Sequence, residues 1–474
     1  MYFGKLRDIA AAELKMGICD VVIAVPGWYT DIQRRALLDA ASIAGLNTLR
    51  LINDSTAVAL GYGITKSDLP DPENPRHVVF VDVGHSSLSV AVVAFSKVQL
   101  HIKSTAYGRQ FGGRDIDYAL VQHFSEQFKS KYKIDVMSNP KATLRLAAGC
   151  EKLKKVLSAN AEAALNVESI MSDIDASSKL HRDEFESLIS HLLDRIPVPL
   201  TEAVAMSGLT LEQIDAIELV GGSTRIPAVR ARIQSVFPGK VLSTTLNQDE
   251  AVARGATFSC AMLSPTFRVR EFHLHDIAPP YAIKVHWDPT PDQGEADDTE
   301  LVVFARGNAI PSTKVLTFHR KEPFELHASY AEPESLPGRI NPWVGRITVK
   351  SLIPIGKDAP SSSTDVSIVK VKTRLNLHGV MSFEGAYVEE IEEKTEPPVT
   401  MEVDGETKTA EPPKVKRIHR KRELPVVVSS TSLDPTVLEQ FKEREAEMHS
   451  ADKLVMDTEV RLTLTCAFLL SVYD

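Results

Sequence analysis

The chain has 474 residues, of which 43% are hydrophobic and 25% are charged, and its formal net charge is -9. Single hydrophobic cores stop growing beyond roughly 250–300 residues, so we expect about two to four domains at roughly 150 residues each. This composition excludes a fibrous or wholly disordered protein. The acidic balance argues against nucleic acid as the main partner, because duplex binding usually needs a strongly basic face.

The cysteines and the hydropathy pattern indicate the cellular compartment of the protein. Cys19, Cys150, Cys260 and Cys466 stand far apart and form no CxxC pair, which predicts reduced thiols rather than disulfides or a metal site. No window reaches the roughly 18 apolar residues that a membrane helix needs, and the N-terminus lacks the apolar stretch of a secretory signal. We therefore expect a cytosolic protein with no membrane partner, and the nucleus stays open as a second location.

The first part of the chain alternates short apolar runs with helical patterns. Val21–Val25 predicts a strand, and Thr30 is placed to cap a helix that runs to Leu46. The runs VVFVDV (78–83) and LSVAVVAF (88–95) are separated by a few small polar residues, which predicts a β-hairpin. This alternation predicts an α/β domain with helices on the faces of its sheets. Further helices and a buried strand are expected at Asp115–Tyr132, Pro140–Leu157, Arg182–Met206 (interrupted by two prolines) and Ala216–Val220.

After Ser264 the pattern changes to short alternating runs such as YAIKVHW and GRITVK. Such runs, separated by turn residues, are typical of an antiparallel β-sandwich. A following stretch rich in charges and prolines, with few aromatics, predicts a disordered insertion. The predicted organisation is an α/β domain over 1–263, a β-sandwich over 264–388, a disordered charged insertion over 389–431 and a helical segment over 432–474.

The predicted hairpin carries the first candidate site. Asp82 ends its first strand, and Gly84, His85, Ser86 and Ser87 form its turn. A carboxylate at a strand end can hold a magnesium-bound water, and the amides of such a turn can cradle phosphate oxygens. An aspartate before a glycine is also ordinary hairpin chemistry, so a plain turn is an equal alternative.

A second candidate is the loop FGGRDID, where Gly112 and Gly113 precede a predicted helix. Paired glycines let the backbone approach a ligand closely, and a helix N-terminus favours an anion. Taken alone, a sharp loop with a helix cap explains the pair better than a ligand does.

A third candidate is the segment LVGGSTRIPAV. Gly221 and Gly222 stand between a buried strand and a helix, followed by Ser223 and Arg225. Exposed amides there suit a phosphate, and an arginine plane can stack on a base. The alternative is a tight strand-to-helix turn.

The fourth candidate is CEKLKKVLSAN, in which Glu151, Lys154, Lys155 and Ser158 fall on nearly one helix face. Such a face can bind a ribose and the edge of a base. A solvated charged surface is the commoner explanation of a pattern like this.

These segments occur together, in this order, within one predicted α/β domain. The combination resembles the actin-like ATPase superfold. INDSTAVALGYG, VDVGHSS, FGGRDID, EKLKKVLSAN, VGGSTRIP and LNQDEAVARGA are similar, almost word for word, to motifs of the 70-kilodalton heat shock chaperone superfamily. The resemblance is dense over residues 20–263 and looser beyond.

Differences from the 70-kilodalton chaperones indicate a branch of the family. Those proteins carry a run of glycines and a threonine in the phosphate hairpin, where this chain has GHSS (84–87), and a glutamate where it has Asp54. These differences, the charged junction after Ser264 and the charged insertion after residue 388 resemble the heat shock protein 110 family. The chain is therefore identified as a member of that large cytosolic branch, in its fungal form.

The resemblance implies a set of ligand-binding residues. Asp82 and Asp54 would order Mg²⁺, with Asp82 acting through water. The other implied contacts to ATP are Gly84, His85, Ser86, Ser87, Gly112, Gly113, Gly221, Gly222, Ser223 and Arg225, with Glu151, Lys154, Lys155 and Ser158 around adenosine and Asp249 closing that side.

The resemblance also implies a co-chaperone that uses ATP as a structural clamp, promotes nucleotide exchange on a 70-kilodalton heat shock chaperone and holds unfolded polypeptide segments. His85 is expected to crowd the γ-phosphate, so any hydrolysis should be slow, with Asp82, Asp54 and Ser87 as weak or vestigial catalytic residues. Two alternatives stay open. The chain is either an ATP-hydrolysing folding chaperone or a passive holdase that cannot bind ATP.

Family members begin with a strand and turn that wrap the phosphates, and with a small subdomain that carries a catalytic lysine. Neither is found in this sequence, and Met1 corresponds to a position well inside the nucleotide domain. We therefore expect an actin-like ATPase domain that is truncated at its N-terminus. An antiparallel β-sandwich and the start of a C-terminal helical lid should follow it.

Overall fold

The structure is a computed structural model in which contacts between residues define two compact units. The β unit comprises Met1–Ile9, Thr30–Gly45 and Tyr281–Asp474, and the α/β unit comprises Ala10–Tyr29 and Leu46–Pro280. The α/β unit thus continues past residue 263, where the sequence placed a boundary. The residues that the structure describes are 1–270, 272–289, 299–353, 367–395 and 415–473.

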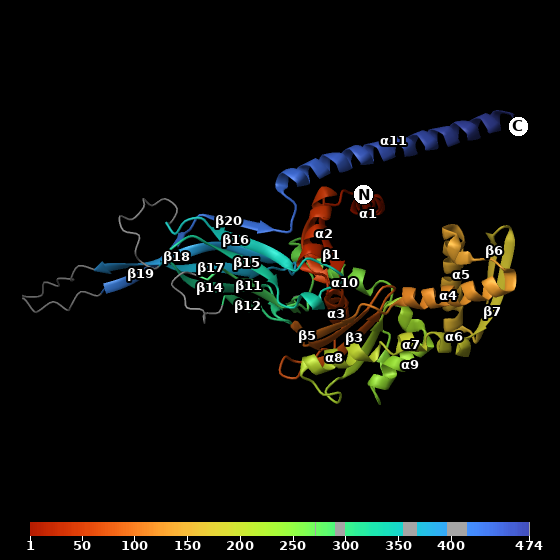
Figure 1. Cartoon of the computed structure of the whole chain (residues 1–474), viewed down its shortest axis with the longest axis horizontal. Helices are drawn as coiled ribbons and strands as arrows, with labels where there is room; N and C mark the ends of the chain where they lie inside the picture. The colour runs from red at the N-terminus through yellow and green to blue at the C-terminus, as the bar shows by residue number, and fades with distance from the viewer. Residues whose placement is uncertain (271, 290–298, 354–366, 396–414, 474) are drawn as a thin grey trace, which may run out of the picture. The chain divides into compact units, whose positions relative to one another are not determined.

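In the α/β unit a mixed sheet has the strand order β10-β5-β4-β3-β8-β9. Two of its strands, β3 and β5, are labelled in Figure 1. Strand β3 pairs antiparallel with β4 and parallel with β8, and the predicted hairpin is confirmed. The strands of this sheet are β3 (Arg76–Val83), β4 (Leu88–Phe95), β5 (Gln99–Gly108), β8 (Ala216–Val220), β9 (Leu242–Ser243) and β10 (His273–Ile277).

Two smaller sheets and the helices complete this unit. A parallel pair is formed by β1 (Asp20–Val25) and β2 (Asn47–Asn53), and an antiparallel pair by β6 (Glu162–Met171) and β7 (Ile174–His181). The predicted helix over 182–206 is three helices, and Pro197 begins the third, because proline suits the first helical turn. The helices are α3 (Asp54–Thr65), α4 (Gly113–Tyr132), α5 (Pro140–Ala159), α6 (Arg182–Leu188), α7 (Ser190–Leu193), α8 (Pro197–Ser207), α9 (Pro227–Val236) and α10 (Ala251–Leu263), with α1 (Tyr2–Leu14) divided between the units.

Both faces of the central sheet are buried, which explains why its strands are continuous apolar runs. Side chains alternate between the two faces of a strand. In β3, Val79 and Val81 join one hydrophobic cluster, whereas Val78 and Phe80 join another. A sheet covered on both faces is what an α/β domain requires, and this rigid platform carries the turn after Asp82.

A buried ionic cluster ties β10 to the rest of the α/β unit, and no sequence pattern indicated it. The carboxylate of Asp276 is 1% exposed and pairs with Arg50 Nη2 at 3.0 Å. It also accepts hydrogen bonds from Asn53 Nδ2 at 3.2 Å and Thr56 Oγ1 at 2.8 Å. These partners lie on β2 and α3, so β10 is held by side chains as well as by its pairing with β5.

Asp276→Ala should lower the free energy of unfolding by about 3 kcal/mol, because removing one partner of a buried ion pair leaves the other charge uncompensated. Urea denaturation followed by circular dichroism measures this change. The control is Asp71→Ala, which removes an ion pair with Lys97 whose carboxylate is 74% exposed and which should change stability little. Equal effects of the two substitutions would contradict the role of the cluster.

The region predicted as a β-sandwich contains two antiparallel sheets. Their strand orders are β12-β11-β15-β16-β20 and β14-β17-β18-β19. Their strands are β11 (Ile283–His286), β12 (Glu300–Phe304), β14 (Ser312–Arg320), β15 (Phe324–Tyr330), β16 (Trp343–Val349), β17 (Ser367–Leu375), β18 (Met381–Thr395), β19 (Val415–Glu423) and β20 (Val426–Ser430).

The prediction of disorder from residue 389 is wrong for the parts of that stretch that the structure describes. Strand β18 continues to Thr395, and β19 pairs with it in the register Glu389↔Lys421 and Glu393↔Arg417. The backbone register therefore pairs the two segments residue by residue along the described part of β18 and β19. Composition alone did not indicate this strand pairing. Residues 396–414 of the predicted insertion lie outside the described residues.

Helix α2 (Asp31–Ile43) belongs to the β unit. Thr30 precedes it as predicted, and Gln33 Oε1 accepts a hydrogen bond from the Thr30 amide at 3.0 Å. The buried carboxylate of Asp31 accepts a hydrogen bond from the Met381 amide at 2.9 Å, and the Asp31 amide donates to Tyr330 Oη at 2.7 Å. Burial raises the pKa of Asp31. These contacts attach α2 to the sheets of the β unit.

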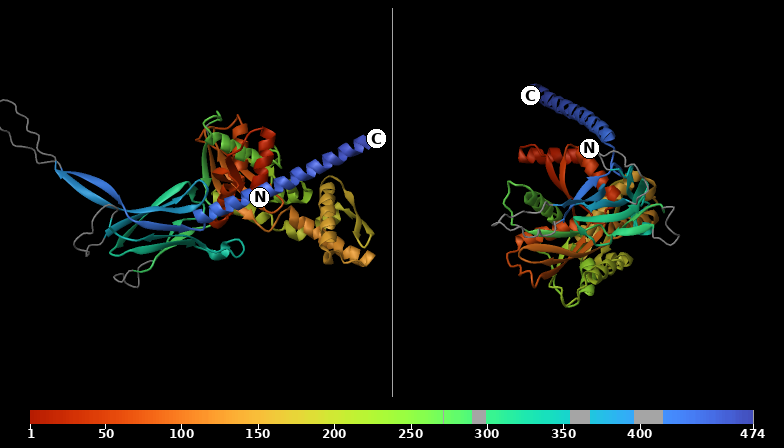
Figure 2. Two further views of the ribbon diagram at one scale, coloured as in Figure 1. Left: turned by 90° about the horizontal axis from the view of Figure 1, so that it is seen from above. Right: turned by 90° about the vertical axis from the view of Figure 1, so that its left-hand side faces the viewer.

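The last helix of the β unit is α11 (Pro435–Tyr473), which both views in Figure 2 show as one long rod that leads to the C-terminus. Its position agrees with the helical pattern in the sequence from about residue 432. Across the part of the chain that the structure describes, no helix has the length and apolar character to cross a bilayer.

Candidate nucleotide-binding site

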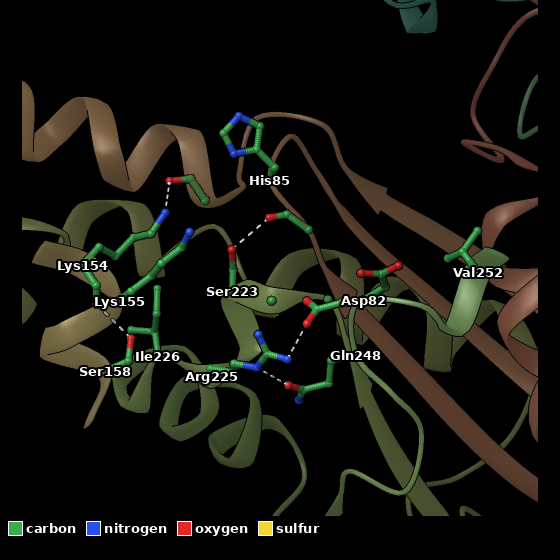
Figure 3. A pocket seen from close by; sticks show the side chains of 15 residues that line it. Asp82, His85, Lys154, Lys155, Ser158, Ser223, Arg225, Ile226, Gln248 and Val252 are labelled. Atoms are coloured by element: carbon green, nitrogen blue, oxygen red, sulfur yellow. Dashed lines mark hydrogen bonds and ion pairs between the residues drawn. The ribbon is translucent and has the colours of Figure 1, made fainter. Parts of the chain in front are cut away.

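The four predicted segments converge on one cavity of about 750 Å³ in the α/β unit (Figure 3). Three lining residues were not predicted from the sequence: Ile226, Gln248 and Val252. The predicted residues that line the cavity are Asp82, Gly84, His85, Gly113, Lys154, Lys155, Ser158, Gly221, Gly222, Ser223, Arg225 and Asp249. The remaining predicted residues, Asp54, Ser86, Ser87, Gly112 and Glu151, adjoin this lining.

The hairpin turn and the glycine loop before α4 form one hydrogen-bonded unit. The Gly84 amide donates to Ser87 O at 3.1 Å, so Ser87 closes the turn. The Gly113 amide in turn donates to Gly84 O at 2.9 Å. A Cβ atom on Gly112 would lie 2.5 Å from the carbonyl oxygen of His85, which is far inside contact distance. The two segments therefore need glycine where they meet.

The turn after β8 lies against the hairpin at an equally close distance. Gly221 has a φ of +82°, and a Cβ atom there would lie 2.4 Å from Asp82 Oδ1 and 2.4 Å from Val83 O. Ser223 Oγ donates to Gly84 O at 3.0 Å. Gly221 is thus required both by its left-handed backbone and by the nearness of β3.

Asp82 lines the cavity, and the carboxylate of Asp54 lies near enough to act on the charge of Asp82. Burial, with a further contribution from the Asp54 carboxylate, raises the pKa of Asp82 to about 7. Asp54 begins α3 and accepts hydrogen bonds from the Ser55 amide at 2.7 Å and from Ser89 Oγ at 3.3 Å. A cation near Asp82 would relieve the desolvation and the repulsion together.

This pair fits magnesium in one particular way. Among the described residues there is no group of three or more metal-ligating side chains, so the chain offers no complete cage. Magnesium is usually held by one or two carboxylates together with waters and the phosphates of the ligand. Asp82 and Asp54 would be those carboxylates, and the bound ion would neutralise phosphate charge in the cavity.

The lysines on α5 have different surroundings, although the sequence grouped them on one face. Lys154 Nζ is buried and contacts the Asp117 carboxylate at 2.8 Å and Gly113 O at 3.2 Å. Burial raises the pKa of Asp117, and the ion pair with Lys154 partly offsets this rise. Lys155 is exposed and pairs with Glu151 at 2.7 Å. Lys154 therefore joins α5 to α4, and the exposed Lys155 is the lysine that can exchange its ion pair with Glu151 for a contact to a ligand.

We expect Lys154→Met to lower the free energy of unfolding by about 2–3 kcal/mol, because it leaves the Asp117 carboxylate buried without its cation. Lys155→Met should leave stability nearly unchanged, because an exposed pair one helical turn apart contributes little. Thermal unfolding of the two variants side by side measures the contrast. Equal losses would show that the ion pair with Asp117 has no special weight.

Arg225 is the cation on the opposite side of the cavity. Its Nε donates to Gln248 Oε1 at 2.9 Å, a bond that Figure 3 marks with a dashed line. Its Nη2 lies 2.7 Å from Asp249 Oδ2. Ser158 also lines the cavity, and its Oγ donates to Lys154 O at 3.0 Å. Ile226 and Val252 are apolar, and no residue type or spacing in the sequence distinguished them.

The mixed sheets and the cavity formed by glycine turns define a nucleotide-binding protein of the actin-like ATPase class. The chain belongs to the heat shock protein 70 family, in its 110-kilodalton branch, and the family model described as Hsp70 protein matches residues 1–464. The identification made from the motifs is confirmed.

Similar proteins come from fungi and mammals. The chain is 50% identical over 466 residues to heat shock protein hsp88 of Neurospora crassa, covering 97% of this chain and 64% of that protein. It is 44% identical over 468 residues to a heat shock protein homolog of Saccharomyces cerevisiae, covering 97% of this chain and 65% of that protein. It is 46% identical over 406 residues to heat shock 70 kDa protein 4 of Rattus norvegicus, covering 85% of this chain and 47% of that protein. The chain therefore spans less than two thirds of the length of these relatives.

Proposed function

We propose that the chain binds ATP with Mg²⁺ in this cavity and acts as a cytoplasmic co-chaperone that promotes nucleotide exchange on a 70-kilodalton heat shock chaperone. One observation carries the proposal. Four segments that are far apart in the sequence meet on a single cavity, and each contributes the residue type that one part of a nucleotide requires. Family membership supports the same assignment.

The chemistry of the lining matches the parts of a nucleotide. Glycine turns that meet at contact distance leave room for phosphates beside the backbone. The Asp82 and Asp54 carboxylates suit a cation that phosphates complete. Lys155 and Arg225 supply positive charge, and the arginine plane suits stacking on a base. The glycine turns, the carboxylates and the cations do not each point to one ligand alone, but together they match Mg²⁺-ATP.

ATP is proposed to act mainly as a clamp. His85 lines the cavity at the hairpin turn, where a smaller residue would leave more room for the γ-phosphate. Because the hairpin and the glycine loop are bonded to each other through Gly84 and Gly113, a ligand that contacts both would hold them together. Asp82, Asp54 and Ser87 are accordingly weak catalysts at most.

Exchange itself requires only differential binding. A co-chaperone accelerates ADP release from its partner if it binds the open form of the partner more tightly than the closed form. A preference of about 1.4 kcal/mol shifts the equilibrium tenfold. No covalent step is needed.

Stopped-flow release of a fluorescent ADP from a 70-kilodalton chaperone tests the proposal. With ATP present, the full chain should accelerate release by about tenfold or more, within the usual range of coupling energies. Arg225→Ala serves as the matched variant, because it weakens the clamp and should reduce the acceleration. No acceleration by the unchanged chain would reject the exchange function.

A second candidate function is holding unfolded segments. Several apolar side chains on strands of the β unit are about half exposed: Leu301 at 47%, Val302 at 52%, Val315 at 47% and Ile368 at 51%. Exposed apolar groups on strands can contact an extended peptide. Suppressed aggregation of a heated client without nucleotide, weakened by Val315→Ser, would favour this function. ATP turnover stimulated by peptide would instead favour a hydrolysing chaperone.

A further inference from the structure

Gln248 lines the cavity, but none of the contacts to ATP proposed above involves it. It lies in the turn just before α10. Its backbone carbonyl accepts a hydrogen bond from the Gly221 amide at 3.1 Å. Its side chain reaches both Thr224 and Arg225. Gln248 therefore joins the segment before α10 to the turn after β8 through main chain and side chain.

A buried hydroxyl sets the direction of the Gln248 amide. Thr224 is 0% exposed, and its Oγ1 donates its single proton to Gly221 O at 2.7 Å. Oγ1 can then only accept from Gln248, whose Nε2 lies 3.0 Å away. The amide oxygen must consequently face Arg225, and Nε of that residue lies 2.9 Å from it. The order of donors and acceptors leaves no freedom to reverse the amide.

Arg225 is thereby held on one edge by two acceptors from one turn. Gln248 Oε1 accepts from Nε, and Asp249 Oδ2 accepts from Nη2 at 2.7 Å. Asn247 Oδ1 accepts from the Asp249 amide at 3.0 Å, which fixes that turn. The Arg225 side chain is 53% exposed. Without these partners it would sample many rotamers, and ordering it would oppose binding.

We propose that Gln248 is a positioning residue, which sets the plane of the Arg225 guanidinium for stacking on the base of the bound nucleotide. The inference rests on the proposed function and deepens it. Gln248 holds Nε of Arg225 and Asp249 holds Nη2, so the plane of the guanidinium is fixed before the ligand arrives. Such pre-organisation acts on affinity by removing an ordering cost.

A double-mutant cycle in the full chain tests the inference. Gln248→Met keeps the length of the side chain and removes both hydrogen bonds. It should weaken Mg²⁺-ATP binding about tenfold in the unchanged chain, because the ordering cost of Arg225 must then be met on binding. In the Arg225→Ala background, the same substitution should change the affinity less than about twofold, because its target is absent. Isothermal titration calorimetry gives the four affinities, and thermal unfolding checks that each variant is folded.

A conservative variant tests whether Gln248 orients Arg225 or only stabilises the fold. Gln248→Glu retains an acceptor for Arg225 and should recover most of the affinity that Gln248→Met loses, although it cannot donate to Thr224. If Gln248→Met weakens binding equally in both backgrounds, or not at all, the inference fails while the proposed function stands. If the unchanged chain shows no heat with Mg²⁺-ATP, both fail together.

Discussion

Gly221→Ala should abolish measurable binding of Mg²⁺-ATP and lower the free energy of unfolding by about 3 kcal/mol. The backbone of Gly221 has a φ of +82°, and an added Cβ would lie 2.4 Å from both Asp82 Oδ1 and Val83 O. The left-handed conformation alone costs an L-residue about 1–2 kcal/mol. The overlap with β3 must additionally push the turn away from the hairpin. A displacement of about 1 Å of the groups that form a site can lower its function roughly 100-fold.

Gly208→Ala is the matched control for this prediction. Gly208 has a φ of +71°, close to that of Gly221, but no heavy atom lies within 4 Å of its added Cβ. It therefore carries the conformational cost without the overlap, and we expect a loss of about 1 kcal/mol with unchanged nucleotide affinity. Urea denaturation and calorimetric titration measure the two quantities. If the two glycine variants behave alike, the close approach of the turn to β3 has no functional weight.

Asp82→Asn should make the ligand-free chain more stable at neutral pH and make Mg²⁺-ATP bind more weakly. Burial and the neighbouring Asp54 raise the pKa of Asp82 from 3.8 to about 7, so its ionised form is unfavourable in the folded chain. Asparagine cannot ionise and avoids this cost. It also lacks the charge that orders the waters of the metal ion, and such a loss costs roughly 10- to 100-fold in metal affinity.

The raised pKa of Asp82 also determines how the stability of the fold changes with pH. Between about pH 4 and pH 7 the folded chain keeps the Asp82 proton that the unfolded chain has lost, so protonation stabilises the fold on the acidic side. The contribution is lost as the pH rises through the folded pKa, and it is at most about 4 kcal/mol for a shift of this size. Asp82→Asn should remove this downward slope.

Denaturation of the ligand-free chain across this pH range, with a chelator present, measures the slope. Asp68 provides a control of opposite sign, because its pKa is lowered by the hydrogen bond and charge of Arg76. Its contribution is present above its unfolded pKa and is lost as the pH falls, so Asp68→Asn should leave the slope above pH 5 intact. A variant at Asp82 that keeps the wild-type slope would show that another group titrates there.

The sequence predicted those parts of the site that depend on local backbone chemistry. A glycine pair between an apolar run and a helix can be recognised by itself, and the hairpin around Gly84 is a local turn. The sequence could not show that Lys154 and Lys155, which it grouped on one helix face, have different surroundings. They are neighbours in the chain, but the position of α4 decides that Lys154 is buried against Asp117 and that Lys155 is not.

Features that depend on distant pairing could not be predicted. Gln248 is separated from Arg225 by more than twenty residues, and its amide direction depends on the buried Thr224 hydroxyl. Asp276 meets Arg50 only because β10 joins the sheet beside β5. The charged runs of β18 and β19 indicated disorder when each was read alone, because their pairing joins two segments that are separated in the sequence.

The anchoring of Asp276 also shows to which unit the chain before it belongs. All the side chains that hold this carboxylate lie on β2 and α3, within the α/β unit. The stretch Ser264–Arg270, which looks like a connector between domains when the sequence is inspected, therefore runs between α10 and β10, two elements of the same unit. It is an internal loop of the nucleotide-binding unit, and the strand that follows it is held by the Asp276 cluster.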